Sequence, residues 1–485
     1  MKSLKFTSES VGSTLVFAVS SKKNQLEVLG KVNGTDTNNL AKVLDRLRFA
    51  AKPDEVIKFP LGEKTIVATG VGAWSEKFDS EILRRAAGAA ARALSGEKSA
   101  TFIFPAKSST ELSAIAEGAA LGSYQFSDFK ATSLKEMKAP LEEIVVKTDL
   151  AKSVDTKAIA KRVEILAKNS YLIRDLINTP PSHLTPIEFT NRLKKLATNL
   201  KLKVEVLDEK VLKAKGYGGI IGVGQGSANP PRLMRVSYSP TKPRKRYAIV
   251  GKGITFDTGG LALKPANGVE AMKADMSGAA AVIATVLAAA ELKLPVAIDA
   301  WAPLAENMVS ENATRPSDII KIYGGKTVEV LNPDAEGRLI LADALMRAQE
   351  FNKNLDGIID VATLTGAQVV ALGTRTSAAM TNNEELLDKF LSAAKNSGEQ
   401  FWPMPLPEEL RASLDSPVAD IANIGERMGG MLVAGLFLRE FVSIPWLHLD
   451  IAGPAFNEGR AHGYTPVGGT GVALRSLISL FESEI

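Results

Sequence analysis

The sequence predicts an α/β fold of two domains, each a mixed or mostly parallel sheet flanked by helices. Three observations lead to this prediction. The chain has 485 residues, which is long for a single core because domains usually hold roughly 100 to 200 residues. Short β-rich runs alternate with helical runs in both halves of the chain, as in α/β proteins. A continuous helical stretch over residues 155–177 lies between the two halves.

Residues 1–150 are predicted to form an N-terminal α/β domain. Its β-rich runs cover residues 15–19, 65–68 and 100–104, and a helical run covers residues 82–94. The first run is shorter than the roughly 7 to 15 apolar residues of a signal peptide, and Lys22 and Lys23 follow it. It is therefore interpreted as a strand.

Residues 151–177 are predicted to form a linker helix that Pro180 and Pro181 end, because proline cannot continue a helix. Residues 178–485 then form the C-terminal domain. Its strands are predicted over residues 247–250, 296–300, 327–331 and 357–361, and its helices over residues 278–292 and 338–351. Strands joined by helices run parallel, so the motifs that follow three of these strands are expected to open onto one rim.

The composition is that of an ordinary globular protein, with 45% hydrophobic and 23% charged residues. The lack of cysteine excludes disulfides, a cysteine nucleophile and thiolate metal ligands. The longest apolar segment, residues 279–290, is shorter than the roughly 20 residues of a membrane span. A cytoplasmic protein without membrane contact is therefore the expectation.

The charge gives little support to nucleic-acid binding. The net charge of +5 is small for this length. One basic cluster lies between proline-containing turns and consists of Lys242, Arg244, Lys245 and Arg246. A solvated loop is its favoured interpretation, since no base-reading motif accompanies it.

Residues 331–339 carry the most informative pattern, with Asp334, Glu336 and Arg338 at every second position. In an extended or turning backbone these side chains project to the same side. Two carboxylates suit a divalent metal, and the guanidinium suits an anion beside it. Pro333 and Gly337 argue against a regular helix here, and a helix is predicted to begin with the apolar run at residues 339–345.

A second glycine-rich segment follows the strand at residues 247–250 and adds Lys252, Asp257, Lys264 and Asp275. Glycines let the backbone approach a ligand closely. Four carboxylates near one rim repel one another strongly unless cations lie between them. The sequence therefore predicts a two-metal site.

The histidines limit the kind of metal site, because the chain has only His183, His448 and His462, without a His-Glu-x-x-His pattern. These three are interpreted as structural or surface residues. An oxygen-rich site suits manganese or magnesium and still permits zinc. Two such ions can share a water and clamp the attacking and leaving atoms of a hydrolysis.

Taken together, these motifs resemble those of the leucyl aminopeptidase family, which are hexameric dinuclear metallopeptidases of the cytosol. The similar segments are residues 178–181, 222–227, 250–260, 272–281, 332–345, 362–366 and 446–453. They cover essentially the whole C-terminal domain, and residues 84–90 extend the likeness weakly into the N-terminal one. The resemblance implies a catalytic C-terminal domain, an N-terminal domain with an oligomeric or regulatory role, and a homohexamer.

The resemblance also implies the ligands. One metal is held by Asp257, Asp334 through side chain and backbone carbonyl, and Glu336. The other is held by Lys252, Asp257, Asp275 and Glu336. Lys252 then has to be neutral, although the pKa of lysine is about 10.4 in water. Lys264 and Arg338 are the implied catalytic pair.

The implied reaction is the release of N-terminal residues, preferably leucine and other apolar ones, from peptides with a free N-terminus. A hydroxide that bridges the two ions attacks the carbonyl, and Lys264 stabilises the oxyanion. A bicarbonate ion held by Arg338 is the implied base. The implied ions are two of Mn²⁺ or Zn²⁺, with Mg²⁺ open. Met272, Thr363, Leu364 and Gly366 resemble the lining of the family's substrate pocket.

The chain departs from the family pattern at several positions. Family members usually carry threonine at Pro333, commonly serine at Thr258 and commonly glycine at Ser277. Residues 431–434 also differ, which bears on side-chain preference. Two alternative functions are a dinuclear hydrolase of phosphate esters and a DNA-binding architectural protein with an incidental metal site.

Overall fold

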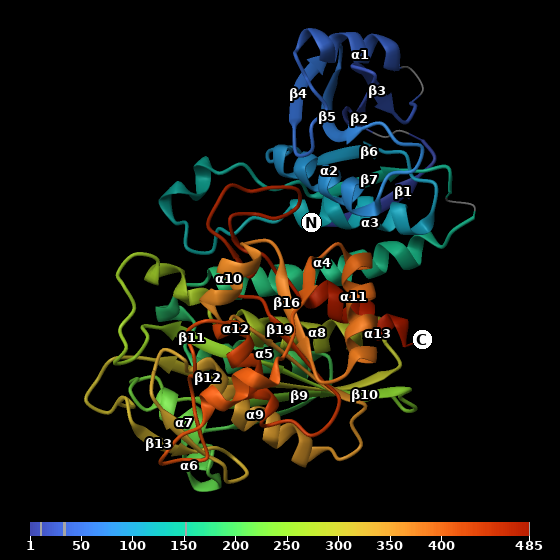
Figure 1. Cartoon of the computed structure of the whole chain (residues 1–485). Coiled ribbons are helices and arrows are strands. Elements are labelled where there is room, and N and C mark those ends of the chain that lie inside the picture. The colour runs from blue at the N-terminus through green and yellow to red at the C-terminus, as the bar shows by residue number, and fades with distance from the viewer. Residues whose placement is uncertain (10–11, 33–34, 151–152, 485) are drawn as a thin grey trace. The chain divides into compact units, whose positions relative to one another are not determined.

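The computed structural model describes residues 1–9, 12–32, 35–150 and 153–484 (Figure 1). The chain divides into two compact units. Unit 1 holds Met1–Tyr171 and Asn457–Val467, and unit 2 holds Leu172–Phe456 and Gly468–Ile485. Residues 151–152, with which the predicted linker begins, and residue 485 lie outside the described residues. The predicted linker helix itself is α4, Thr156–Asn178.

Unit 1 is built on one mixed sheet of the order β1-β7-β6-β2-β5-β4, with β3 paired to β2. Its strands are β1 Ser3–Thr7, β2 Thr14–Lys22, β3 Gln25–Leu29, β4 Val56–Leu61, β5 Lys64–Ala73, β6 Ser99–Ile103 and β7 Glu143–Lys147. Its helices are α1 Thr37–Arg46, α2 Ser80–Ala93 and α3 Ser109–Gly122, with the 3₁₀ turn η1 Thr132–Glu136. The strands and the helix predicted in this part of the sequence are confirmed.

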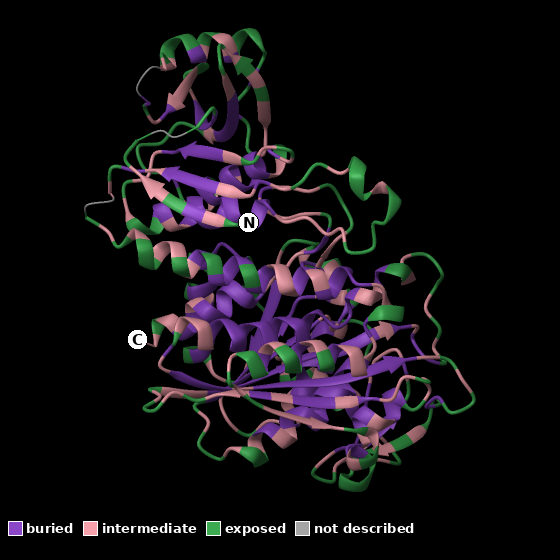
Figure 2. Cartoon of the chain, turned by 180° about the vertical axis from the view of Figure 1, so that it is seen from behind, coloured by how far each residue is buried: buried purple, intermediate pink, exposed green. Residues whose placement is uncertain are grey.

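Alternation along β2 explains the two layers of unit 1. Val16 and Ala18 are buried in a cluster with residues of α2 and α3, whereas Leu15 and Phe17 are buried in a second cluster with residues of α1. Successive side chains of a strand point to opposite faces. Both faces of this sheet are therefore covered by helices, and Figure 2 shows buried residues along its strands.

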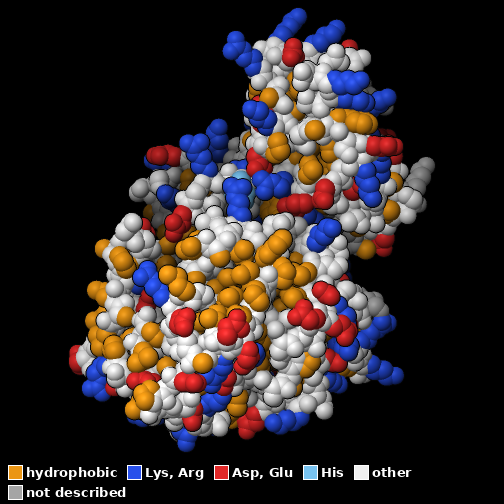
Figure 3. All heavy atoms as spheres, viewed as in Figure 1, with side chains coloured by type: hydrophobic (Ala, Val, Ile, Leu, Met, Phe, Trp, Pro, Cys, Tyr) orange, Lys and Arg blue, Asp and Glu red, His pale blue; other side chains and the backbone are white. Residues whose placement is uncertain are grey.

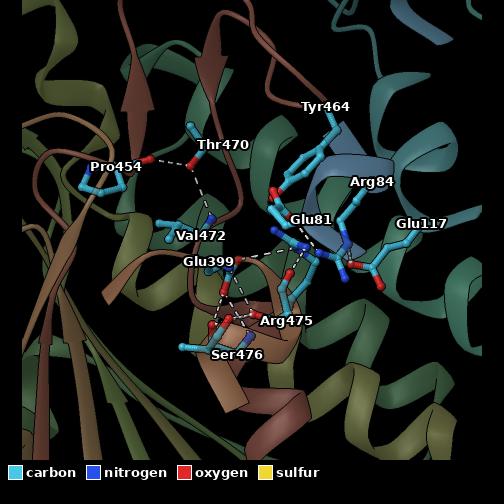
Figure 4. Close-up of polar contacts among 12 residues, drawn as sticks. Glu81, Arg84, Glu117, Glu399, Pro454, Tyr464, Thr470, Val472, Arg475 and Ser476 are labelled. Carbon is cyan, nitrogen blue, oxygen red and sulfur yellow. Dashed lines mark hydrogen bonds and ion pairs between the residues drawn. The ribbon is translucent and has the colours of Figure 1, made fainter. Parts of the chain in front are cut away.

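Unit 1 also includes a segment from far along the chain, Asn457–Val467. The Tyr464 hydroxyl lies 2.9 Å from Glu81 Oε1, as Figure 4 shows. The amide of Gly463 donates to Asp54 Oδ1 at 2.9 Å, and Arg92 Nε donates to the Gly463 carbonyl at 2.9 Å. Polar contacts therefore tie this late segment to the N-terminal residues.

Unit 2 is built on a larger mixed sheet of the order β17-β16-β19-β15-β10-β12-β9-β8, with β11 paired to β12. Its strands are β8 Lys203–Leu207, β9 Arg232–Tyr238, β10 Lys245–Gly251, β11 Gly253–Asp257, β12 Val296–Asn307, β15 Gly357–Ala362, β16 Ser377–Thr381, β17 Phe401–Pro403 and β19 Trp446–Asp450. The four central strands β12, β10, β15 and β19 are mutually parallel. The mixed α/β class predicted from the sequence is confirmed.

Helices flank this sheet. They are α5 Pro186–Asn199, α6 Glu209–Lys215, α7 Gly218–Gly224, α8 Ser277–Leu292, α9 Gly337–Phe351, α10 Gly366–Leu372, α11 Glu384–Ser397, α12 Gly430–Arg439 and α13 Leu474–Ser483, with the 3₁₀ turns η3 Pro181–His183, η4 Val269–Ala274 and η5 Glu408–Leu414. The short strands are β13 Asp318–Lys321, β14 Thr327–Val330, β18 Ile421–Ala422, β20 Phe456–Asn457 and β21 Gly468–Gly469. At the start of α13, Ser476 N donates to Glu399 Oε2 at 3.0 Å (Figure 4).

One strand lies elsewhere than predicted. β14, the strand before the Asp334 motif, was expected in the parallel sheet, but it belongs to a separate three-stranded sheet of the order β13-β14-β18. β13 and β14 form an antiparallel pair, joined by a short turn that contains Gly324 and Gly325, both with positive φ. An antiparallel pair needs only a short connection. β14 therefore pairs with β13, its neighbour in sequence, rather than joining the large sheet through a crossover connection.

The helix predicted over residues 278–292 is confirmed as α8, and the 3₁₀ turn η4 precedes it. By length and composition Val269–Leu292 passes as a membrane-spanning segment, but 83% of its apolar window is buried inside the protein. In α8 every residue from Ser277 to Ala289 is buried. A helix that is apolar on all sides and buried is typical of the core of a large protein.

Candidate metal centre

The carboxyl ends of the four parallel strands bring polar residues to one edge of the large sheet. Lys252 follows β10, Asn307 ends β12, Thr363 follows β15 and Asp450 ends β19. This edge is where ligands bind in open α/β sheets. The predicted rim is therefore present, although the Asp334 motif reaches it from the smaller sheet.

Three carboxylates converge at this edge. Asp257, Asp334 and Glu336 each offer a ligand oxygen, and these oxygens lie within 4.8 Å of one another. Asp257 and Glu336 are buried, and Asp334 is half-buried. Within the described part of the chain this is the one such group of potential ligands, and it contains no histidine.

Lys252 and Asp275 form the inner half of the site with Glu336. Lys252 Nζ lies 2.8 Å from Asp275 Oδ1 and 2.8 Å from Glu336 Oε1. It also donates to the carbonyl of Thr363 at 2.7 Å. A Cβ at Gly337 would lie 2.5 Å from Lys252 Cε. The glycine that opens α9 is therefore needed for the lysine to reach the carboxylates.

Lys264 forms the outer half with Asp257 and Asp334. Its Nζ lies 2.9 Å from Asp257 Oδ2 and pairs with Asp334 Oδ1. The Lys264 side chain is 21% exposed and that of Asp334 is 31% exposed, whereas the Lys252 side chain is 4% exposed. The two lysines thus occupy different environments within one acidic cluster.

Burial changes the protonation of this cluster. It raises the pKa of Asp275 to about 8 and also raises the pKa of Glu336. Burial on its own would lower the pKa of Lys252, but the carboxylates of Asp275, Glu336 and Asp257 raise it. Without metal, the ammonium group of Lys252 is the inner cation that balances the carboxylates.

The residues present fit a pair of divalent ions. Four carboxylates meet two amines in a space whose ligand oxygens lie a few ångströms apart. Asp275 Oδ2 is buried and has no hydrogen-bond partner among the described residues. A buried unpaired carboxylate oxygen is costly, and a cation at this point removes that cost. Oxygen ligands of this kind suit hard divalent ions.

Arg338 lies in the first turn of α9 and is buried. Its Nη1 donates to the backbone carbonyl of Asn423 at 2.9 Å. Its Nε is buried and has no hydrogen-bond partner among the described residues. Burial lowers the pKa of Arg338 to about 10, against the opposing charges of Glu336 and Asp450. The guanidinium thus retains unused donor capacity beside the acidic cluster.

The four residues predicted to line a substrate pocket lie in four different settings. The Thr363 hydroxyl donates to Asp275 Oδ1 at 2.7 Å. The amide of Leu364 donates to Asp450 Oδ1 at 3.1 Å. Gly366 opens α10, where a Cβ would meet open space, and half-buried Met272 lies in η4. The structure thus joins Thr363 to the metal centre through Asp275.

Sequence patterns missed two asparagines at this centre. Asn307 Nδ2 donates to Asp257 Oδ1 at 2.8 Å and to the Pro333 carbonyl at 3.1 Å. Its place at the end of a parallel strand is a signal that could have identified it. Asn423 is fully buried and contacts the loop before Glu336, but a lone asparagine after a two-residue strand carries no such signal.

His448 is buried in the large sheet outside the carboxylate group. Its Nδ1 lies 2.5 Å from Asp360 Oδ1, and Trp446 Nε1 donates to Asp360 Oδ2 at 2.7 Å. Burial on its own would lower the pKa of His448, but the charge of Asp360 raises it. The Asp360 carboxylate therefore supports a cationic imidazole in the core.

Comparison with known proteins gives consistent matches. Residues 171–478 match the model of the "Cytosol aminopeptidase family, catalytic domain", and residues 15–133 match that of the "Cytosol aminopeptidase family, N-terminal domain". A probable cytosol aminopeptidase of Streptomyces avermitilis is 53% identical over 91% of this chain and 89% of its own length. One of Rhodococcus erythropolis is 47% identical over 98% of both chains.

A solved structure is also similar along nearly the whole chain. The bottromycin maturation enzyme BotP in complex with Mn superposes with a TM-score of 0.86 at 35% sequence identity, over 98% of this chain and 99% of its own.

Proposed function

The chain belongs to the cytosol aminopeptidase family of metal-dependent exopeptidases, and on that premise we propose that it releases N-terminal leucine and other apolar residues from peptides. The single observation that supports this most is the convergence of Asp257, Asp334 and Glu336 within 4.8 Å, with one lysine on each side. We take such a cluster to support the binding of two cations rather than a structural ion pair.

The proposed ligands follow the two halves of the site. The outer ion is held by Asp257, Asp334 and Glu336, and the inner ion by Lys252, Asp257, Asp275 and Glu336. Asp257 and Glu336 then serve both ions. Lys252 has to lose its proton to act as a ligand, so ion binding and proton release are coupled. The ions proposed are Mn²⁺ or Zn²⁺, with Mg²⁺ also suited to oxygen ligands.

Ions held by these residues would supply Lewis-acid polarisation of the peptide carbonyl and would activate the attacking water. The carboxylates around Lys264 outweigh its partial burial and raise the pKa of its amine. Lys264 therefore remains an ammonium that can donate to the developing oxyanion. Arg338 offers its unpartnered Nε to an anion, for which we propose bicarbonate acting as the base.

Several features of the surroundings support finer proposals. Met272, Thr363, Leu364 and Gly366 are proposed to line the pocket for the N-terminal side chain. We propose that residues 178–485 act as the catalytic domain, residues 151–177 as a linker, and residues 1–150 in assembly or regulation. A cytoplasmic location is proposed from the cytosolic names of the relatives.

A homohexamer is also proposed from the family resemblance, and unit 2 exposes large apolar side chains that further copies can cover. Leu263 is 67% exposed, Met428 79% and Val370 89%, and Figure 3 shows hydrophobic side chains gathered on one face of this unit. Exposed apolar patches of this kind mark interaction surfaces.

The test compares three substrates with Mn²⁺ present. Leucine p-nitroanilide should be cleaved, and its N-acetyl derivative should not, because only the former has a free α-amine. A phosphate ester such as p-nitrophenyl phosphate should remain intact. Cleavage of the acetylated anilide at a similar rate would contradict an aminopeptidase, and turnover of the phosphate ester alone would favour the alternative hydrolase. A panel of amino-acid amides then measures the apolar preference.

A further inference from the structure

We propose that Asn423 is a positioning residue that gives the loop of Asp334 and Glu336 its metal-binding shape and holds Arg338 beside it. The inference rests on the proposed function, since it concerns the proposed ligands. Asn423 follows β18 and is fully buried. β18 runs parallel to β14 with Glu329 opposite Ala422, and the amide of Asn423 donates to the Glu329 carbonyl at 2.9 Å. Parallel pairing therefore places Asn423 beside residues 331–335.

The side-chain amide of Asn423 is used completely by this one loop. Its Oδ1 accepts from the amides of Leu331 at 2.8 Å and Asn332 at 3.2 Å. Its Nδ2 donates to the carbonyls of Asn332 at 2.7 Å and Ala335 at 3.3 Å. An asparagine amide has two donor hydrogens and one acceptor oxygen with two lone pairs. Both donor hydrogens and both acceptor lone pairs are thus occupied by residues 331–335.

The remaining amides of the loop are also satisfied within the protein. The amide of Asp334 donates to Asn332 Oδ1 at 2.9 Å, and the amide of Ala335 donates to the Asn332 carbonyl at 3.0 Å. Pro333 has no amide hydrogen and needs no acceptor. The loop is therefore held in shape by hydrogen bonds that do not involve a metal, which is the arrangement expected of a preorganised site.

The backbone carbonyl of Asn423 gives the residue its second task. It accepts from Arg338 Nη1 at 2.9 Å, so the guanidinium is anchored to the same residue that shapes the ligand loop. Partners behind the direct ligands orient them, and their loss typically costs about 10- to 100-fold in metal affinity. Asn423 is expected to behave in this way.

The test is isothermal titration of the full-length, metal-stripped protein with Mn²⁺. Asn423→Asp keeps the shape of the side chain but replaces both donors with an acceptor that faces two carbonyls. We expect the Mn²⁺ affinity of N423D to fall about 10- to 100-fold. The control away from the site is Asn382→Asp, because the exposed Asn382 also joins two backbone groups, the Ile444 carbonyl at 3.0 Å and the Trp446 amide at 2.7 Å. N382D should bind Mn²⁺ like the wild type.

A second readout needs no metal. Hydrogen exchange, measured by mass spectrometry on the metal-free protein, should rise in the peptide over residues 331–336 for Asn423→Ser, a milder variant in case N423D fails to fold. Wild-type affinity and unchanged exchange in the Asn423 variants would overturn the inference, as would an equal loss of affinity in N382D. If the wild-type protein binds no Mn²⁺, the proposed function fails together with the inference. If the wild type binds Mn²⁺ and the Asn423 variants bind it equally well, only the inference fails.

Discussion

The inner and outer halves of the acidic cluster use the same kinds of residue in different surroundings. Around Lys252 every side chain is nearly buried, at 4% exposure for the lysine, 8% for Asp275 and 2% for Glu336. Around Lys264 the lysine is 21% exposed and Asp334 is 31% exposed. A buried amine is easier to convert into a neutral ligand once cations arrive, whereas a partly exposed one keeps its proton. The same residue type can thus serve as ligand in one half and as catalytic cation in the other.

The largest effect is expected where the halves meet. Glu336→Ala removes the carboxylate proposed to serve both ions and leaves Lys252 without one partner. Its kcat/KM for leucine p-nitroanilide with excess Mn²⁺ should fall by more than about 10³-fold, more than one oxyanion donor typically contributes. A loss below tenfold would mean that Glu336 is not shared between the ions.

The next largest effects should distinguish the roles of Lys264 and Lys252. Lys264→Ala should lower kcat by about 10²- to 10³-fold while Mn²⁺ affinity changes only a few-fold, since this lysine is proposed to act as a cation. Lys252→Ala should instead reduce the bound Mn²⁺ per chain from two to one. The check is steady-state kinetics paired with titration calorimetry. Weakened metal binding in Lys264→Ala with unchanged kcat would reverse the two roles.

The rates at which the two halves lose their ions should also differ, by a smaller factor. The outer ion is proposed to bind half-buried Asp334. EDTA should therefore remove it roughly tenfold faster than the ion of the buried inner half, because dissociation needs access of water and chelator. Elemental analysis during dialysis should show a plateau near one Mn²⁺ per chain. Loss of both ions at one rate would show that the halves are equivalent in exchange.

The smallest effect on activity is expected from a buried carboxylate without a lysine partner. Asp343 in α9 accepts from the amides of Ile220 and Tyr323, both at 2.7 Å, and burial raises the pKa of Asp343 to about 7. Because this pKa is above the ordinary value of an aspartate, the protein takes up a proton when it folds at a pH between about 4 and 7. The resulting stability is complete below about pH 4 and is lost as the pH rises through 7, by at most about 4 kcal/mol.

Asp343→Asn cannot titrate and isolates this contribution. The melting temperature of the variant, relative to the wild type, should therefore rise between pH 5 and pH 7, with activity at saturating Mn²⁺ within about twofold. A difference in melting temperature that stays constant with pH would show that Asp343 keeps its ordinary titration in the fold.

The sequence was most informative where chemistry is concentrated in charged residues. The motifs were sufficient to group Asp257, Asp334 and Glu336, although the strand order expected for the Asp334 motif was wrong, because β14 belongs to the smaller sheet. The helix after the motif begins at Gly337, one residue before the helix predicted over residues 338–351. Glycine alone reads as a helix breaker, but here it leaves room for Lys252.

Other features depend on tertiary contacts that no local pattern encodes. Asn423 acts on a loop some 90 residues earlier, and its own neighbours in sequence carry no charge. β14 was placed in the wrong sheet because a four-residue strand has the same pattern in either one. Such pairings are chosen by packing and by the need to satisfy buried backbone groups.

The most direct test of a two-ion centre is activity against leucine p-nitroanilide as a function of Mn²⁺ added to exhaustively chelated protein. We expect no measurable turnover without metal, and recovery that is complete only at two equivalents per chain, matched by two bound ions in elemental analysis. Undiminished activity after complete chelation, or full recovery with one equivalent, would contradict a two-ion centre.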